Sequence, residues 1–153
     1  MRRLRAEHDA LATLSRIITE LVDQPHPPPS AELCSVRGML RDTLVRHLKC
    51  EDWVLYPRLK ASGDVALIRM AAEFVAEMGD IASDFQAYDG KWTEEQVAAD
   101  WPGFCHETRA VLGLLAVRIE RENEELYPAV ERVAVAQAAL VDPAVRAGGT
   151  ISS

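Results

Sequence analysis

The sequence predicts an all-α protein, built as an up-down-up-down four-helix bundle with a helical extension at its C-terminal end. Three observations predict this fold class. Apolar residues recur at steps of three and four in four long segments, no segment shows the alternation of a strand, and most connections are short. The chain of 153 residues is long enough for one domain. We expect that domain over residues 1–141 and a flexible tail at 142–153.

The bulk composition excludes several classes of function. Hydrophobic residues make up 48% and charged residues 27%, which is a globular balance. The net charge of −7 argues against nucleic-acid binding, which usually requires a basic patch. No segment approaches the about 18 uncharged apolar residues of a membrane span. Charged residues interrupt any signal-peptide pattern near the start, and the three cysteines are scattered, so we expect a cytoplasmic protein.

The first two helices are defined by a periodic face and by their ends. The first helix keeps on one face Leu4, His8, Leu11, Ser15, Ile18 and Val22. It stops at Gln24 because the PHPPP run that follows cannot continue a helix. Ser30 is a suitable N-cap for the second helix, which we expect to end near Lys60. The face of the second helix carries Leu33, Val36, Leu40, Leu44, His47, Glu51 and Val54.

The third and fourth helices are predicted in the same way. From about Asp64 the third helix keeps in register Leu67, Ala71, Phe74, Met78, Ile81, Phe85 and Tyr88. DGKW at 89–92 predicts a turn, and Thr93 fits the start of a capping box for a short helix. Pro102 opens the fourth helix, whose face carries Phe104, Thr108, Val111, Leu115, Arg118, Glu122 and Leu126. Residues 129–140 extend the fourth helix or pack as a fifth.

The chain contains an internal repeat. Residues 47–57 read HLKCEDWVLYP and residues 118–128 read RIERENEELYP, so both have Glu at the fifth position and end in Leu-Tyr-Pro. These two stretches lie about 70 residues apart in the chain. An offset of about 70 residues also relates AEHDAL at 6–11 to AEMGDI at 76–81. We interpret the chain as two related helix pairs, placed about a pseudo-twofold axis.

Antiparallel packing brings the repeated polar residues to one level of the bundle. With a rise of about 1.5 Å per residue, His8 and His47 lie at nearly the same distance from the connection between the first two helices. His47 and Glu51 are four residues apart and share a helix face, as do Arg118 and Glu122. The sequence therefore predicts an interior polar layer made of His8, His47, Glu51, Met78, Arg118 and Glu122.

Two facing carboxylates in a bundle core repel each other unless a cation lies between them. A metal ion is one candidate, because His and carboxylate ligands on facing helices suit iron, manganese or zinc. Arg118 is the other candidate, because its guanidinium stays protonated and can bridge two carboxylates through forked hydrogen bonds. The residue types alone leave both candidates open.

These residues resemble the pattern of the hemerythrin-like, or HHE cation-binding, family. In that pattern the first and third helices each carry a His, the second and fourth carry His-x-x-x-Glu, and Leu-Tyr-Pro commonly follows the Glu. The matching stretches are EH at 7–8, HLKCE at 47–51 and IERE at 119–122, with both Leu-Tyr-Pro endings. The resemblance covers nearly all of residues 1–135 and implies a hemerythrin-like bundle.

The resemblance also implies a site. In the family these positions hold a non-haem di-iron centre that binds or senses oxygen and related small molecules. His8 and His47 match the two terminal ligands of one iron. Glu51 and Glu122 match the two carboxylates that bridge the irons. The terminal ligands of the other iron are replaced by Met78 and Arg118. A thioether is a poor ligand for ferric iron and a guanidinium repels cations, so we expect the second half of the site to be lost.

Two hypotheses for the site follow. In the first, no di-iron centre forms and no cofactor is bound; Arg118 bridges Glu51 and Glu122, and Met78 fills the core. In the second, a single Fe or Zn ion is held by His8, His47, Glu51 and Glu122. An oxidase of the ferritin-like type would need Glu-x-x-His pairs on two helices, and the sequence contains none.

The two hypotheses predict different functions. The first predicts a regulatory module that is not an enzyme and acts through another protein or through self-association. That prediction is reached by elimination, because no catalytic constellation remains. The second predicts a metal-binding sensor or carrier, including a residual oxygen- or redox-sensing non-haem iron site. In neither case do we expect a nucleic acid or a membrane as partner.

Overall fold

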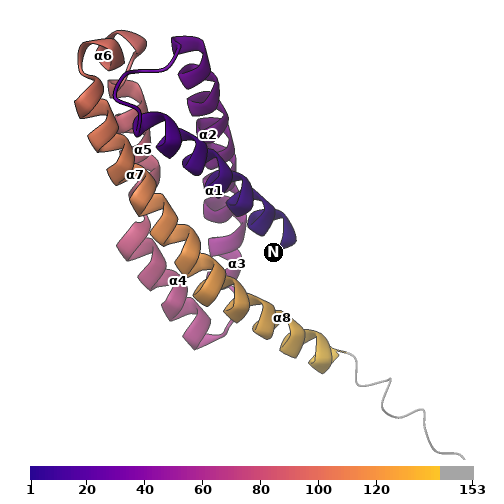
Figure 1. Cartoon of the computed structure of the whole chain (residues 1–153). Coiled ribbons are helices and arrows are strands. Elements are labelled where there is room, and N and C mark those ends of the chain that lie inside the picture. The colour runs from indigo at the N-terminus through magenta and orange to yellow at the C-terminus, as the bar shows by residue number, and fades with distance from the viewer. Residues whose placement is uncertain (142–153) are drawn as a thin grey trace, which may run out of the picture.

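The computed structural model describes residues 1–141, apart from the side chains of Met78, Leu140 and Val141, and every regular element in this part of the chain is helical. Figure 1 shows an elongated bundle through which the chain runs up, down, up and down. The predicted all-α bundle is confirmed. The tail predicted at 142–153 lies outside the described residues, and the domain boundary at 141 stays a prediction.

The first two long helices are α1, Arg2–Val22, and α2, Ser30–Cys50. They pack against each other, and α1 also packs against α7. The prediction of Ser30 as an N-cap is wrong. Pro29 occupies the cap position with φ −50° and ψ 133°, and Ser30 is already the first helical residue. The fixed φ of proline suits the extended backbone that leads into the helix.

A short π-helix follows α2 and another follows α7. The first, η1, spans Glu51–Leu55 and leads into α3, Tyr56–Lys60; the second, η2, spans Glu122–Leu126 and leads into α8, Tyr127–Val141. The N–H of each tyrosine bonds to the carbonyl five residues back. The proline after each tyrosine has no N–H and crowds the preceding turn, and the wider turn accommodates it. The fourth helix therefore extends continuously into α8, one of the two predicted outcomes.

The third helix of the bundle is broken into α4, Val65–Met78, and α5, Ile81–Lys91, so the prediction of one continuous helix is wrong. The break follows Gly79, where an added Cβ would lie only 2.3 Å from the Val75 carbonyl oxygen. The turn predicted at DGKW is also shifted. Its first three residues still belong to α5, which ends at Lys91, and Trp92 is the C-cap residue.

Two helices that start near the upper end of the bundle in Figure 1, α6 and α7, are capped by side chains. Thr93 accepts a hydrogen bond from the Gln96 N–H at 3.2 Å and caps α6, Glu94–Ala99, as predicted. Asp100 caps α7, Trp101–Arg121, through the Gly103 N–H at 2.9 Å. These caps place α6 across the end of the bundle and start α7 on its way back down.

The core divides into two apolar clusters with a polar layer between them. One cluster is centred on Leu11, Leu44 and Leu115, and the other on Leu4, Leu55 and Leu126. Along α1, His8 lies between the leucines of the two clusters, and Arg118 and Glu122 lie between them along the fourth helix. The polar layer therefore interrupts the core instead of lying at one end.

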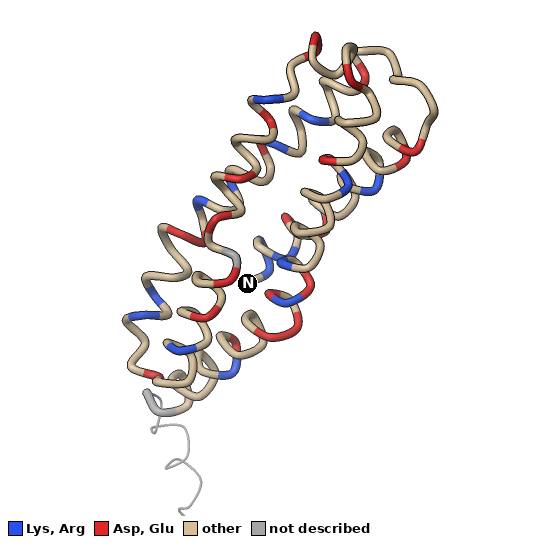
Figure 2. Tube along the Cα trace, turned by 90° about the vertical axis from the view of Figure 1, so that its left-hand side faces the viewer, with Lys and Arg blue, Asp and Glu red and all other residues tan. Residues whose placement is uncertain are grey.

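The surface carries both signs of charge along the whole bundle. Figure 2 shows lysine and arginine positions interspersed with aspartate and glutamate positions. This distribution lacks the concentrated basic stripe of a nucleic-acid-binding face. Among the described helices, none has the length and apolarity that crossing a membrane requires.

Candidate metal centre

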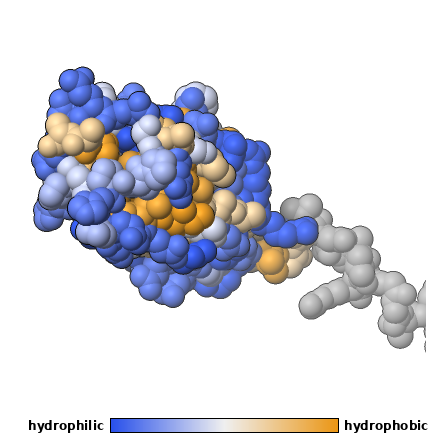
Figure 3. Space-filling model, turned by 45° about the horizontal axis from the view of Figure 1, so that its top comes forward, coloured by the Kyte–Doolittle hydropathy of each residue, from blue (hydrophilic) through white to orange (hydrophobic). Residues whose placement is uncertain are grey.

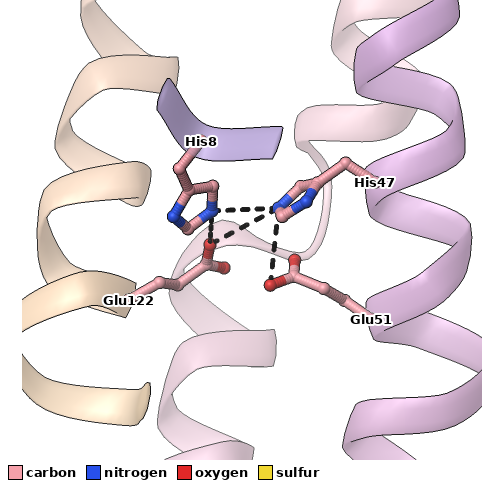
Figure 4. Close-up of side chains that lie close together, drawn as sticks. All are labelled: His8, His47, Glu51 and Glu122. Atoms are coloured by element: carbon pink, nitrogen blue, oxygen red, sulfur yellow. Dashed lines mark hydrogen bonds and ion pairs between the residues drawn. The ribbon is translucent and has the colours of Figure 1, made fainter. Parts of the chain in front are cut away.

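Four buried side chains from four helical segments meet in the polar layer. His8 comes from α1, His47 from α2, and Glu51 and Glu122 are the first residues of η1 and η2. Their exposed fractions are 1%, 2%, 0% and 0%. Figure 4 shows all four side chains pointing toward one another. The structure therefore brings together all four predicted ligands, whereas the side chain of Met78 lies outside the described residues.

The donor atoms of these four side chains are close enough to share one ion. Nε2 of His8 lies 3.0 Å from Nε2 of His47 and 3.1 Å from Oε2 of Glu122. Nε2 of His47 lies 3.5 Å from Oε1 of Glu51. One ligand atom from each residue falls within 4.8 Å of all the others. Two imidazole nitrogens and two carboxylate oxygens form a donor set that suits zinc or iron.

The far nitrogen of each imidazole has its own acceptor. Nδ1 of His47 lies 3.2 Å from Oε2 of Glu7, and Nδ1 of His8 lies 3.0 Å from Oδ1 of Asn123. Arg5, which can only donate, contacts the same Asn123 oxygen at 3.5 Å and supports its assignment as the acceptor. Both Nδ1 atoms therefore face an acceptor, and both Nε2 atoms point into the layer. Metal-ligating histidines are held in this way.

Arg118 bridges the two buried carboxylates, as predicted. Its Nε donates to Oε1 of Glu122 and its Nη2 donates to Oε2 of Glu51, each at 2.7 Å. Burial acts to lower the pKa of Arg118, but the charges of Glu122 and Glu51 outweigh it and raise the pKa above its ordinary value. The guanidinium is therefore a fixed positive charge on the side of the layer away from the histidines.

Two tyrosines and the residues behind the histidines were not predicted as part of the site. The Tyr127 hydroxyl donates to Oε1 of Glu51 at 2.8 Å, and its ring stacks on His8 with centroids 5.2 Å apart. Burial and the two glutamates raise the pKa of both Tyr127 and Tyr56, so both stay protonated. The signal was present, because Tyr127 and Tyr56 belong to the repeated Leu-Tyr-Pro. Glu7 and Asn123 directly adjoin predicted ligands in the sequence.

The two carboxylates differ in their surroundings. Burial and the neighbouring Glu122 raise the pKa of Glu51. Burial also acts to raise the pKa of Glu122, but its contacts with the two histidines and Arg118 lower it overall. In the state in which Glu51 as well as Glu122 is ionised, the single charge of Arg118 leaves one negative charge on the two carboxylates. A cation on the histidine side would offset that charge.

The four donors and the Arg118 guanidinium lie on opposite sides of the two carboxylates. The Arg118 guanidinium occupies Oε1 of Glu122 and Oε2 of Glu51. The other two carboxylate oxygens, Oε2 of Glu122 and Oε1 of Glu51, face the histidines. The layer therefore has one half filled by a protein cation and one half lined by four donors.

Comparison with known proteins identifies the family. Residues 1–130 match the hemerythrin HHE cation-binding domain, which covers most of the chain and includes all four donor residues. No curated protein and no solved structure gives a match. The chain belongs to the hemerythrin HHE cation-binding domain family.

Proposed function

We propose that this protein is a hemerythrin-type module that binds a single Fe or Zn ion and acts as a metal-dependent sensor or regulator rather than as an enzyme. The ligands are His8, His47, Glu51 and Glu122. The observation that carries the proposal is the convergence of both Nε2 atoms on one point while both Nδ1 atoms are held by Glu7 and Asn123. We expect the protein to work in the cytoplasm.

The protonation of the two imidazoles supports a bound cation. When both imidazoles are neutral and each Nδ1 donates its proton to its acceptor, the two Nε2 lone pairs face each other at 3.0 Å, and Oε2 of Glu122 is a further acceptor beside them. Acceptors this close repel one another unless a cation or an extra proton lies between them. A metal ion satisfies all of these acceptors at once, whereas one extra proton satisfies two of them.

Arg118 supports the restriction to one ion. Its two donated hydrogen bonds occupy the carboxylate oxygens that a second metal would use, and its charge repels a second cation. An iron at the remaining position would supply reversible binding of a small ligand or of an electron. The paired chemistry of two irons needs the position that Arg118 fills, and this supports a sensing or regulatory role rather than catalysis.

The metal-free form is the competing function, and one observation favours it. Arg118 already neutralises one of the two carboxylates, and His47 could carry the remaining positive charge as an imidazolium. Burial acts to lower the pKa of His47, but Glu122, Glu51 and Glu7 outweigh burial and raise it. In this form the bundle would act only through its surface.

A metal titration separates the two functions. Metal-stripped protein is titrated with Zn²⁺ in air and with Fe²⁺ under nitrogen, and binding is followed by calorimetry. We expect saturable binding that His47→Ala weakens by about 100-fold or more, because one of four ligands is removed. His106→Ala is the matched control, since His106 is an exposed histidine of α7, and it should bind as the wild type does. Equal weak binding by all three proteins would reject the metal site.

A further inference from the structure

The outer face of α7 exposes an apolar strip. Leu114 and Val117 are 60% and 52% exposed, although both lie in the middle of a long helix. Exposed residues of the same face continue toward both ends of the helix. We define the α7 strip as His106, Arg109, Ala110, Gly113, Leu114, Val117, Glu120 and Glu124, all of them exposed. Figure 3, in which the top of the molecule in Figure 1 comes forward, shows hydrophobic residues gathered among hydrophilic ones on one face.

The charges of the strip are divided between its two ends. Arg109 lies toward the N-terminal end of α7, whereas Glu120 lies toward its other end and Glu124 lies in η2, directly beyond it. Within the described residues neither Glu120 nor Glu124 forms an ion pair. Arg109 is held at the edge of the strip by Asp23 at 2.9 Å, and its side chain stays 49% exposed. A strip that is basic at one end and acidic at the other is complementary to itself when it is turned around.

From this self-complementarity we propose that the strip binds a second copy of this chain, so that the two α7 helices pack antiparallel about a twofold axis near Leu115. This interface is independent of the metal centre. Antiparallel packing about that point brings Arg109 of one copy level with Glu120 of the other to within about 1.5 Å along the axis. His106 lies level with Glu124 in the same way. Each pair occurs twice, as an isologous interface requires.

The small and large side chains of the strip are also complementary in this arrangement. Val117 of one copy lies level with Gly113 of the other, so that a branched side chain meets a position without one. An added Cβ at Gly113 would meet nothing within 4 Å in the single chain, so the space there is open to a partner. Leu114 lies within about 1.5 Å of the twofold axis in height and meets its own copy. A parallel pair would instead place like charges together at both ends.

The size of the strip sets the expected affinity. From His106 to Glu124 the helix spans about 27 Å, and one helix pair of this length buries less than the about 800 Å² per partner of stable complexes. We therefore expect a dimer that dissociates in the micromolar range. Salt should weaken it, because its ends are held by exposed charge pairs.

Analytical ultracentrifugation over a range of protein concentrations tests the dimer with charge variants. Glu120→Arg should weaken the dimer by about tenfold, and the double variant Arg109→Glu/Glu120→Arg should restore it. Leu114→Glu should abolish it at micromolar concentration. Val135→Glu is the matched control, because Val135 is a 71% exposed valine outside the strip and should leave the dimer unchanged. Circular dichroism confirms that each variant is folded. A wild type that stays monomeric at several hundred micromolar, or a dimer that survives Leu114→Glu, would overturn the proposal.

Disulfide trapping tests the direction of packing. Leu114→Cys should cross-link to its own copy under mild oxidation, because it lies beside the twofold axis. His106→Cys should not, because its copy would lie about 27 Å away along the axis. The wild type, with its three cysteines, is oxidised in parallel as the background. Efficient cross-linking through His106→Cys together with none through Leu114→Cys would overturn the antiparallel arrangement.

Discussion

Arg118 lies where the family pattern has a histidine, and its guanidinium contacts both buried carboxylates. Its two hydrogen bonds of 2.7 Å tie Glu51 to Glu122 across the bundle. A buried pair of this kind adds little net stability compared with apolar packing, but removing one partner leaves buried charge uncompensated. The consequences of this replacement can be measured at single residues.

Replacing Arg118 with Ala should lower the free energy of unfolding by about 3–5 kcal/mol, because two carboxylates would then face each other without their cation. Arg16→Ala is the matched control, an exposed arginine of α1 that is ion-paired on the surface with Glu20, and it should cost less than about 1 kcal/mol. Urea unfolding of the metal-stripped proteins gives both values. Equal losses would show that Arg118 does not neutralise the layer.

Glu7 contacts Nδ1 of His47, the ring nitrogen that points away from the proposed metal position. We expect Glu7→Gln to weaken metal binding by about 10–100-fold, because the amide no longer fixes the proton on Nδ1 of His47. Glu20→Gln, on the exposed part of the same helix, should bind metal as the wild type does. Competition with a chromogenic chelator measures the affinities. An unchanged affinity in Glu7→Gln would remove Glu7 from the site.

The sequence predicted the residues of the layer better than their partners. His8, His47, Glu51, Glu122 and Arg118 were predicted because repeat and helix periodicity together fix their height and face. The contacts of Glu7 and Asn123 depend on side-chain rotamers and on the wide turn at Glu122. A periodicity of about 3.6 residues carries no information about either.

At the scale of the helices, the apolar periodicity predicts where each long helix runs but not where its backbone departs from α-helical geometry. The apolar register of the third helix continues from Phe74 to Phe85, so periodicity predicts no break between α4 and α5. The backbone at the break leaves no room for a Cβ at Gly79, because the Val75 carbonyl oxygen lies too close. The π-turns are also invisible to periodicity, although the prolines of the two Leu-Tyr-Pro stretches mark their ends. These turns place Glu51 and Glu122 at matching positions of the two helix pairs.

Gly79→Ala should destabilise the fold by about 1–3 kcal/mol, because its methyl group would lie too close to the Val75 carbonyl and the backbone would have to move. Gly90→Ala is the matched control within α5, where an added Cβ meets nothing within 4 Å. That change should stabilise by about 0.5–1 kcal/mol, the usual gain of Ala over Gly in a helix. Thermal unfolding followed by circular dichroism compares the two. A stabilising Gly79→Ala would show that the break tolerates a side chain.

At the scale of the molecule, the polar layer lies between two apolar clusters. Together these clusters contain residues of every long helix. The bundle, its topology and its family follow from the sequence, because periodicity and short connections define them. The contacts of Arg118 with the oxygens of Glu51 and Glu122 do not follow from the sequence, because they depend on side-chain conformations. A ligand bound in this layer therefore acts on the stability of the whole bundle.

Metal binding should raise the stability of the intact protein. At a free metal concentration 100 times the dissociation constant, the expected gain is about 2.7 kcal/mol. The melting temperature of the metal-loaded protein should therefore exceed that of the stripped protein and should fall again when a chelator is added. In His47→Ala the same addition of metal should leave the melting temperature unchanged. A shift of equal size in that variant would place the stabilising ion elsewhere.

The number of ions bound per folded chain tests the central claim most directly. Native mass spectrometry of the chain, loaded with Zn²⁺ or anaerobically with Fe²⁺, resolves each bound ion as a separate mass. Met78→His/Arg118→His restores both missing family ligands, and we expect it to bind two ions, which shows that the measurement can detect a second. For the wild type we expect one ion per chain. Two ions in the wild type would contradict the role of Arg118, and none would contradict the metal site.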